Sequence, residues 1–65
     1  MNVSKLRGLI AERGLSQSEV AKALGMADKT FYNKMKKGGF RTDEAESLID
    51  LLKIQNPIEI FFEQK

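Results

Sequence analysis

Residues 16–37 read SQSEVAKALGMADKTFYNKMKK, a stretch that predicts two short helices joined by a tight turn. Ser16 and Glu19 have the spacing of a capping box, in which the side chain of each residue accepts a hydrogen bond from the backbone N–H of the other. This box would begin a helix over residues 17–24. Gly25 would end that helix, because glycine readily adopts the left-handed backbone conformation common at helix ends.

The second of these helices is expected over residues 28–37, only two residues after Gly25. Phe31 and Met35 are four residues apart and would face the core. A second, polar face would carry Lys29, Tyr32, Asn33 and Lys36. Asparagine can pair with adenine and lysine can donate to guanine, and two helices joined so closely must cross steeply. The pattern therefore indicates a DNA-reading helix-turn-helix, with an ordinary solvated face as the alternative.

Three further helices are expected from apolar residues at helical spacing, over residues 3–13, 42–54 and 57–63. We see no strand pattern and no internal repeat. The predicted fold is therefore all-α, a compact bundle of five short helices with the helix-turn-helix at the second and third. A chain of 65 residues supports one domain, over residues 1–65.

Local signals mark the end of the third helix and the starts of the fourth and fifth. Gly38-Gly39 would end the third helix, and Thr42 would cap the fourth. Asn56 would cap the fifth helix, with Pro57 at its first position.

The fifth helix is unusually apolar. Adjacent Phe61 and Phe62 cannot both point inward, so one is expected to pack in the core against the first helix and the other to be exposed. An exposed apolar surface of this kind is a candidate dimer seam, formed by Ile58, Phe61 and Phe62.

Composition argues against several classes of function. The chain has no cysteine and no histidine, so it lacks thiolate metal ligands and the commonest general base. Its carboxylates are expected on solvated helix faces, and there is no glycine-rich phosphate loop. We therefore expect no enzyme, cofactor, metal or small-molecule ligand. No apolar run is long enough to span a membrane, and the first residues lack a signal peptide's apolar core, so we expect a cytoplasmic protein.

Charge is unevenly distributed along the chain, although the formal net charge is only +2. Residues 28–41 carry five cations against one anion, whereas residues 42–65 carry six anions against two cations. This basic middle favours an anionic partner there. A solvated lysine-rich face is the alternative.

Residues 15–26, LSQSEVAKALGM, resemble the LTQEELAEKLGV stretch of the Xre/Cro-like (lambda-repressor-like) helix-turn-helix proteins. Residues 30–35, TFYNKM, resemble the TFYRKM-type recognition helix of short phage and prophage members. The order of five helices also agrees, so the resemblance covers nearly the whole chain. It implies a transcriptional regulator, a phage or prophage repressor or Cro-like protein, that binds operator sequences in double-stranded DNA.

The resemblance also implies roles for individual positions. Gln17 and Ser18 would contact backbone phosphates, and Lys37 and Arg41 would flank the groove at the backbone. The major groove would face Ala27, Asp28, Lys29, Thr30, Tyr32, Asn33 and Lys36. If the apolar surface of the fifth helix forms a homodimer, the two recognition helices would read paired half-sites.

The chain departs from the family pattern at three positions. Ala27 stands where the family usually has serine, so the recognition helix lacks its usual cap. Many members carry arginine or glutamine where Asp28 stands; a carboxylate there repels phosphate but can accept from cytosine N4. Lys34 occupies a position that is often apolar.

A protein-interaction module is the alternative function, because fold does not fix function. Such a protein, antitoxin-like or the partner of an antirepressor, would bind another protein through Phe61 and Phe62.

Overall fold

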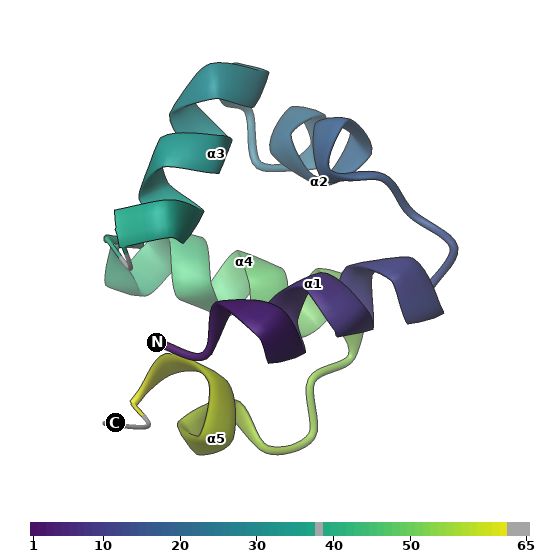
Figure 1. Cartoon of the computed structure of the whole chain (residues 1–65), viewed down its shortest axis with the longest axis vertical. Helices are drawn as coiled ribbons and strands as arrows, with labels where there is room; N and C mark the ends of the chain where they lie inside the picture. Colours follow the sequence, from purple (N-terminus) through teal and green to yellow (C-terminus); the bar gives the residue numbers. More distant parts are fainter. Residues whose placement is uncertain (38, 63–65) are drawn as a thin grey trace.

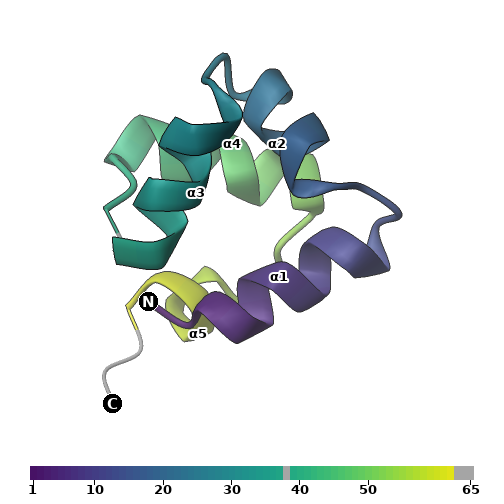
Figure 2. The same ribbon diagram turned by 45° about the horizontal axis from the view of Figure 1, so that its top comes forward.

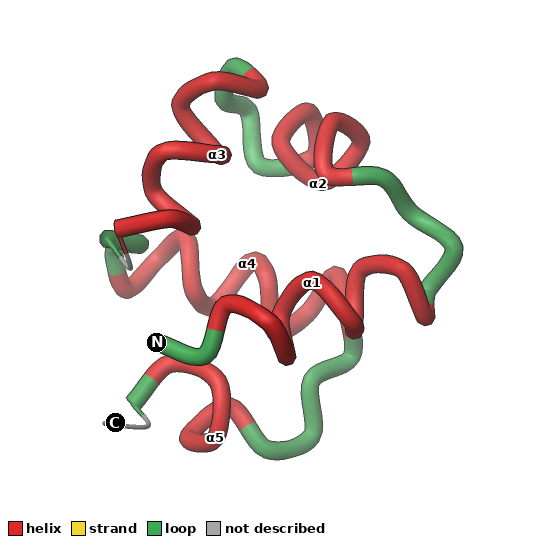
Figure 3. The backbone as a smooth tube through the Cα atoms, viewed as in Figure 1, coloured by secondary structure: helices red, strands yellow, loops and turns green. Residues whose placement is uncertain are grey.

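All the regular secondary structure that the structure describes is helical. The computed structural model describes residues 1–37 and 39–62, which confirms the predicted all-α class for that part of the chain. The five helices, joined by short loops (Figure 1, Figure 3), are α1 (Val3–Glu12), α2 (Gln17–Ala23), α3 (Asp28–Lys37), α4 (Thr42–Leu52) and α5 (Pro57–Phe61). Gly38 of the predicted helix break and Glu63, the predicted end of the fifth helix, lie outside the described residues.

The core forms where the apolar stripes of all five helices meet. Its buried members are aliphatic, aromatic or methionine side chains: Leu6, Ile10, Val20, Ala21, Phe31, Met35, Leu48, Leu52, Ile54 and Ile60. No polar or charged side chain is buried among the described residues. Val3 and Leu9 of α1 pack against this core but stay partly exposed.

Helix α2 has the predicted boundary signals. The Ser16 hydroxyl oxygen accepts from the Glu19 backbone N–H at 3.1 Å, and Glu19 Oε1 accepts from the Ser16 N–H at 2.8 Å. Gly25 has a φ of +75°, the left-handed conformation that ends the helix. The helix ends at Ala23 and Leu24 is its cap, one residue earlier than expected.

The predicted cap residue and the predicted end of α4 are both wrong. Thr42 is the first helical residue and does not cap; the cap position belongs to Arg41. The backbone N–H of Arg41 donates to Glu44 Oε1 at 2.8 Å, because the glutamate carboxylate reaches back over the first turn. At the other end α4 stops at Leu52, two residues early, because Lys53 adopts a left-handed φ of 55°.

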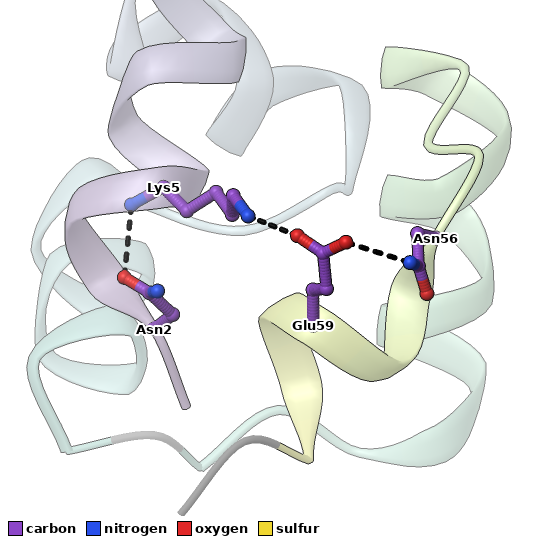
Figure 4. A network of polar contacts seen from close by, with 4 residues as sticks. All are labelled: Asn2, Lys5, Asn56 and Glu59. Carbon is purple, nitrogen blue, oxygen red and sulfur yellow. Dashed lines mark hydrogen bonds and ion pairs between the residues drawn. The ribbon is translucent and has the colours of Figure 1, made fainter. Parts of the chain in front are cut away.

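Helix α5 is tied to α1 by polar contacts (Figure 4). The Lys5 ammonium pairs with the Glu59 carboxylate, as Figure 4 shows. In addition, the backbone N–H of Asn2 donates to the Ile60 carbonyl at 2.7 Å. Asn56 occupies the predicted cap position, but its Nδ2 donates to Glu59 Oε2 at 2.7 Å and its side chain makes no cap bond. The hydrogen bond and positive charge of Lys5 hold the pKa of Glu59 below its usual range.

These contacts set the overall arrangement. Helix α1 packs against both α2 and α5, which lie on opposite sides of it (Figure 1, Figure 2). Helix α2 packs chiefly against α3. None of the helices described has both the length and the apolar character needed to cross a membrane.

Candidate nucleic-acid interface

The buried stripe of α3 sets which of its side chains face outward. Phe31 and Met35 are buried in the core, as predicted. The ring of Phe40, which follows the helix, lies 5.5 Å from the Phe31 ring at a tilt of 48°. This tilted aromatic contact helps to fix the rotation of α3 about its own axis.

The predicted polar face of α3 is exposed along its length, at Lys29, Tyr32, Asn33 and Lys36. Tyr32 is 44% exposed, and Lys36 Nζ lies 5.8 Å from the centroid of its ring, a cation–π contact. The side chains of Lys29 and Asn33 form no hydrogen bond or ion pair with other described residues. Their donors are therefore available to a ligand.

A hydrogen bond links two of the predicted site residues. Ser18 Oγ, in the first turn of α2, donates to Asp28 Oδ2, at the start of α3, at 2.9 Å. Both side chains are exposed, and the carboxylate lies where the helix dipole favours negative charge. The contact joins the two helix starts that the sequence places ten residues apart.

The other predicted residues surround this pair. Ala27 and Thr30 are exposed beside Asp28, and Gln17 is half-buried beside Ser18. The structure therefore brings together the predicted residues at the starts of α2 and α3.

Lys34 does not belong to the exposed polar face. Its Nζ lies 3.2 Å from Glu44 Oε1, and both side chains are partly buried between α3 and α4. Glu44 also accepts from the Arg41 N–H, so one carboxylate holds the second half of α3 and the start of α4. Sequence reasoning missed this contact, because no helical periodicity relates residues of different helices.

At the far end of α3, Lys37 is exposed. Arg41 is exposed as well, and its Nε lies 3.4 Å from Asp43 Oδ1. Both side chains of this pair are 76% exposed, so it is weak, and the guanidinium remains accessible.

No group of three or more carboxylate, imidazole or thiol side chains among the described residues could hold a metal ion. A hollow between α1 and α5 is lined by Gly8, Ile54, Glu59 and their neighbours, away from α3.

Comparisons of the chain with protein-family models, with curated proteins and with solved structures find no match. The resemblance to Xre/Cro-like proteins therefore remains a hypothesis that rests on residues 15–26 and 30–35.

Proposed function

We propose that this chain is a sequence-specific transcriptional regulator that places α3 in the major groove of double-stranded operator DNA. The observation that carries the proposal is the division of α3 into two faces. Its apolar face is held in the core by Phe31 and Met35, so the face with Lys29 and Asn33 is presented on a fixed support. Rigid support of the reading residues is what direct recognition of base edges requires.

Two kinds of contact follow from the chemistry of the exposed groups. Lys37 at the end of α3 supplies charge for backbone phosphates, which fix the position of the protein without reading sequence. Asn33 and Lys29 carry the donors that distinguish adenine and guanine in the major groove. The net charge of +4 over residues 28–41 supports attraction of this region to the phosphate backbone.

This division of labour can be tested with two substitutions. We expect Asn33→Ala to relax base preference at one position of the selected sequence. Lys37→Ala should weaken binding to all sequences alike and lower the slope of log affinity against log salt by about one. Selection from random duplexes, followed by affinity measurement at two salt concentrations, provides both readouts.

Arg7→Ala is the matched control for Lys37→Ala. Arg7 is an exposed cation on α1 and makes no ion pair with other described residues. Its loss should change the slope less than the loss of Lys37. Equal effects of Asn33→Ala and Lys37→Ala on every DNA would contradict the assigned roles.

A protein-interaction module is the second candidate, supported by Ile58 and Phe62, which are 67% and 69% exposed. In that case substitutions on α5 would abolish function, whereas Asn33→Ala would leave it intact.

A further inference from the structure

The hollow between α1 and α5 follows one face of α1. Lys5, Gly8, Leu9, Glu12 and Arg13 line it, and their spacing is that of a single helical stripe. The loop between α4 and α5, together with part of α5, forms the opposite wall (Figure 1). The volume of the hollow is about 510 Å³, within the ~300–1,000 Å³ of typical small-molecule sites. It is therefore large enough to hold a small ligand.

Gly8 leaves the middle of the α1 wall without a side chain. A Cβ added at this position would meet no heavy atom within 4 Å, so close packing does not require a glycine here. Alanine would also stabilise the interior of a helix better than glycine does. The effect of glycine at this position is to keep the hollow open beside the backbone of α1.

Lys53, in the opposite wall, has a backbone conformation that suits glycine better than lysine. Its φ of 55° lies in the left-handed region, where a side chain is strained. Arg13 holds this backbone in place, because its Nε donates to the Leu52 carbonyl at 2.7 Å and its Nη2 to the Lys53 carbonyl at 3.3 Å. Residues that violate local preferences are expected at functional sites. Gly8 and Lys53 both do so, and both line this hollow.

One cation in the lining has no partner of opposite charge among the described residues. Lys5 pairs with Glu59 (Figure 4), and Glu12 Oε1 lies 3.9 Å from Arg13 Nη1. Lys53 is exposed, and its side chain forms no hydrogen bond or ion pair with other described residues. No other charged residue of the described chain lines the hollow, so it is complementary to a ligand with a single negative charge.

Apolar side chains complete the lining. Leu9, which is partly exposed, and Ile54, which is 8% exposed, both contribute to it. A carboxylate carries one negative charge, whereas a phosphate monoester carries nearly two at neutral pH. We propose that the hollow binds a small carboxylic acid with an apolar body. The carboxylate would pair with Lys53, and the body would lie over Gly8 against Leu9.

This site is separate from the proposed DNA-binding face. The hollow lies away from α3, so a bound acid would leave the exposed face of that helix uncovered. The acid would contact α1, α5 and the loop between α4 and α5, and by binding only the folded chain it would stabilise the fold. The proposal departs from the expectation, made from sequence, that the chain binds no small molecule.

Phenylacetate is a suitable probe, and phenylacetamide is its uncharged counterpart. We expect titration of phenylacetate into the isotope-labelled whole chain, without DNA, to shift the amide NMR resonances of Gly8, Leu9, Lys53 and Ile54. Phenylacetamide has the same body without the charge, so it should bind about two to five times more weakly, the range for an exposed ion pair.

Two substitutions should weaken binding without weakening the fold. Gly8→Leu fills the hollow and places a good helix former in α1. Lys53→Gly removes the cation and relieves the left-handed strain. We expect Gly8→Leu to abolish the shifts, and Lys53→Gly to bind phenylacetate only as weakly as the wild-type chain binds phenylacetamide. Both variants should unfold at a higher temperature than wild type, which separates loss of the site from loss of the fold.

Each variant has a matched control outside the hollow. Ala11→Leu adds the same side chain at an exposed position of α1, and Arg7→Ala removes an exposed cation from that helix. Both controls should bind phenylacetate as the wild-type chain does.

The proposal would be overturned if millimolar phenylacetate shifted no amide of the hollow, or shifted only those at the end of α5 around Phe62. Equal affinity for phenylacetate and phenylacetamide, or wild-type affinity in Gly8→Leu, would also overturn it. Since no DNA is present, these outcomes do not bear on the proposed DNA-binding function. Failure of the chain to select a DNA sequence would likewise leave this site untouched.

Discussion

The hydroxyl of Ser18 and the carboxylate of Asp28 lie 2.9 Å apart, and this contact changes what each can offer to DNA. The Ser18 hydroxyl donates its proton to the Asp28 carboxylate. Ser18 would therefore be a weaker hydrogen-bond donor to a DNA phosphate than its position in α2 implies. Asp28 keeps its second oxygen free of hydrogen bonds from described residues, and in the major groove a carboxylate oxygen accepts from cytosine N4. If α3 binds DNA as proposed, the pair favours base contact over phosphate contact at the start of the helix.

Replacing this carboxylate by an amide should change the preferred base. We expect Asp28→Asn to shift the selected base at one position from cytosine to adenine, because asparagine pairs with adenine N6 and N7. The binding free energy that favours cytosine at that position should fall by about 1–3 kcal/mol. Selection from random duplexes with the wild-type and substituted chains provides the measurement.

Ser18→Ala is the control for this prediction. It retains the carboxylate but removes its hydrogen-bond donor, so it should keep the preferred base with weaker discrimination. If Asp28→Asn selects the same base as the wild-type chain, Asp28 does not read DNA.

At the scale of helices, two glycines of similar exposure have different roles. Gly25 ends α2 with a φ of +75°, where a side chain is strained. Gly8 lies inside α1, and a Cβ added there would meet no heavy atom within 4 Å. The turn requires the first glycine, whereas the fold gains nothing from the second.

Alanine substitutions at these positions should therefore have opposite effects on stability. Gly25→Ala should lower the free energy of unfolding by about 1–2 kcal/mol, because alanine is disfavoured in the left-handed region. Gly8→Ala should raise it by about 0.5–1 kcal/mol, because glycine is a poor residue in a helix interior. Urea denaturation of both variants tests the pair, and a destabilised Gly8→Ala chain would contradict the assignment.

For the whole molecule, α5 is held in place by groups that are distant in sequence. Asn2 donates to the Ile60 carbonyl, Lys5 pairs with Glu59, and Ile60 fills the core. The pKa of Glu59 is lowered in the folded chain, so the folded state favours the ionised carboxylate. Its contribution to stability is full above the ordinary glutamate pKa of about 4.3 and is lost as pH falls through the lower folded-state pKa.

Acid should therefore weaken the wild-type chain more than a variant without this carboxylate. We expect Glu59→Gln to be less stable than wild type at neutral pH, with a difference that narrows as pH falls below the usual glutamate range. Thermal unfolding of both chains at several pH values measures this difference in stability. Glu12→Gln, on the solvated side of α1, provides the control. If the difference in unfolding temperature between wild type and Glu59→Gln is the same at every pH, the pairing of Glu59 with Lys5 does not contribute to stability.

The sequence by itself determined the local features of this protein. The capping box at Ser16, the turn at Gly25 and the bounds of α3 all depend on residues within four positions of one another. Helical geometry also predicted that one of Phe61 and Phe62 packs and the other is exposed, and the structure shows that Phe62 is the exposed one. Such short-range rules can be read along one chain segment.

Only the tertiary structure decided how side chains of different helices pair. The contacts of Ser18 with Asp28, of Lys34 with Glu44 and of Lys5 with Glu59 join helices whose relative placement no periodicity predicts. The errors at α4 have a local cause instead, because the Glu44 carboxylate reaches back three residues to the Arg41 N–H and Lys53 adopts a left-handed φ. The hollow between α1 and α5 needs those two helices side by side. Packing of the core fixes these distances, and that packing is a property of the whole chain.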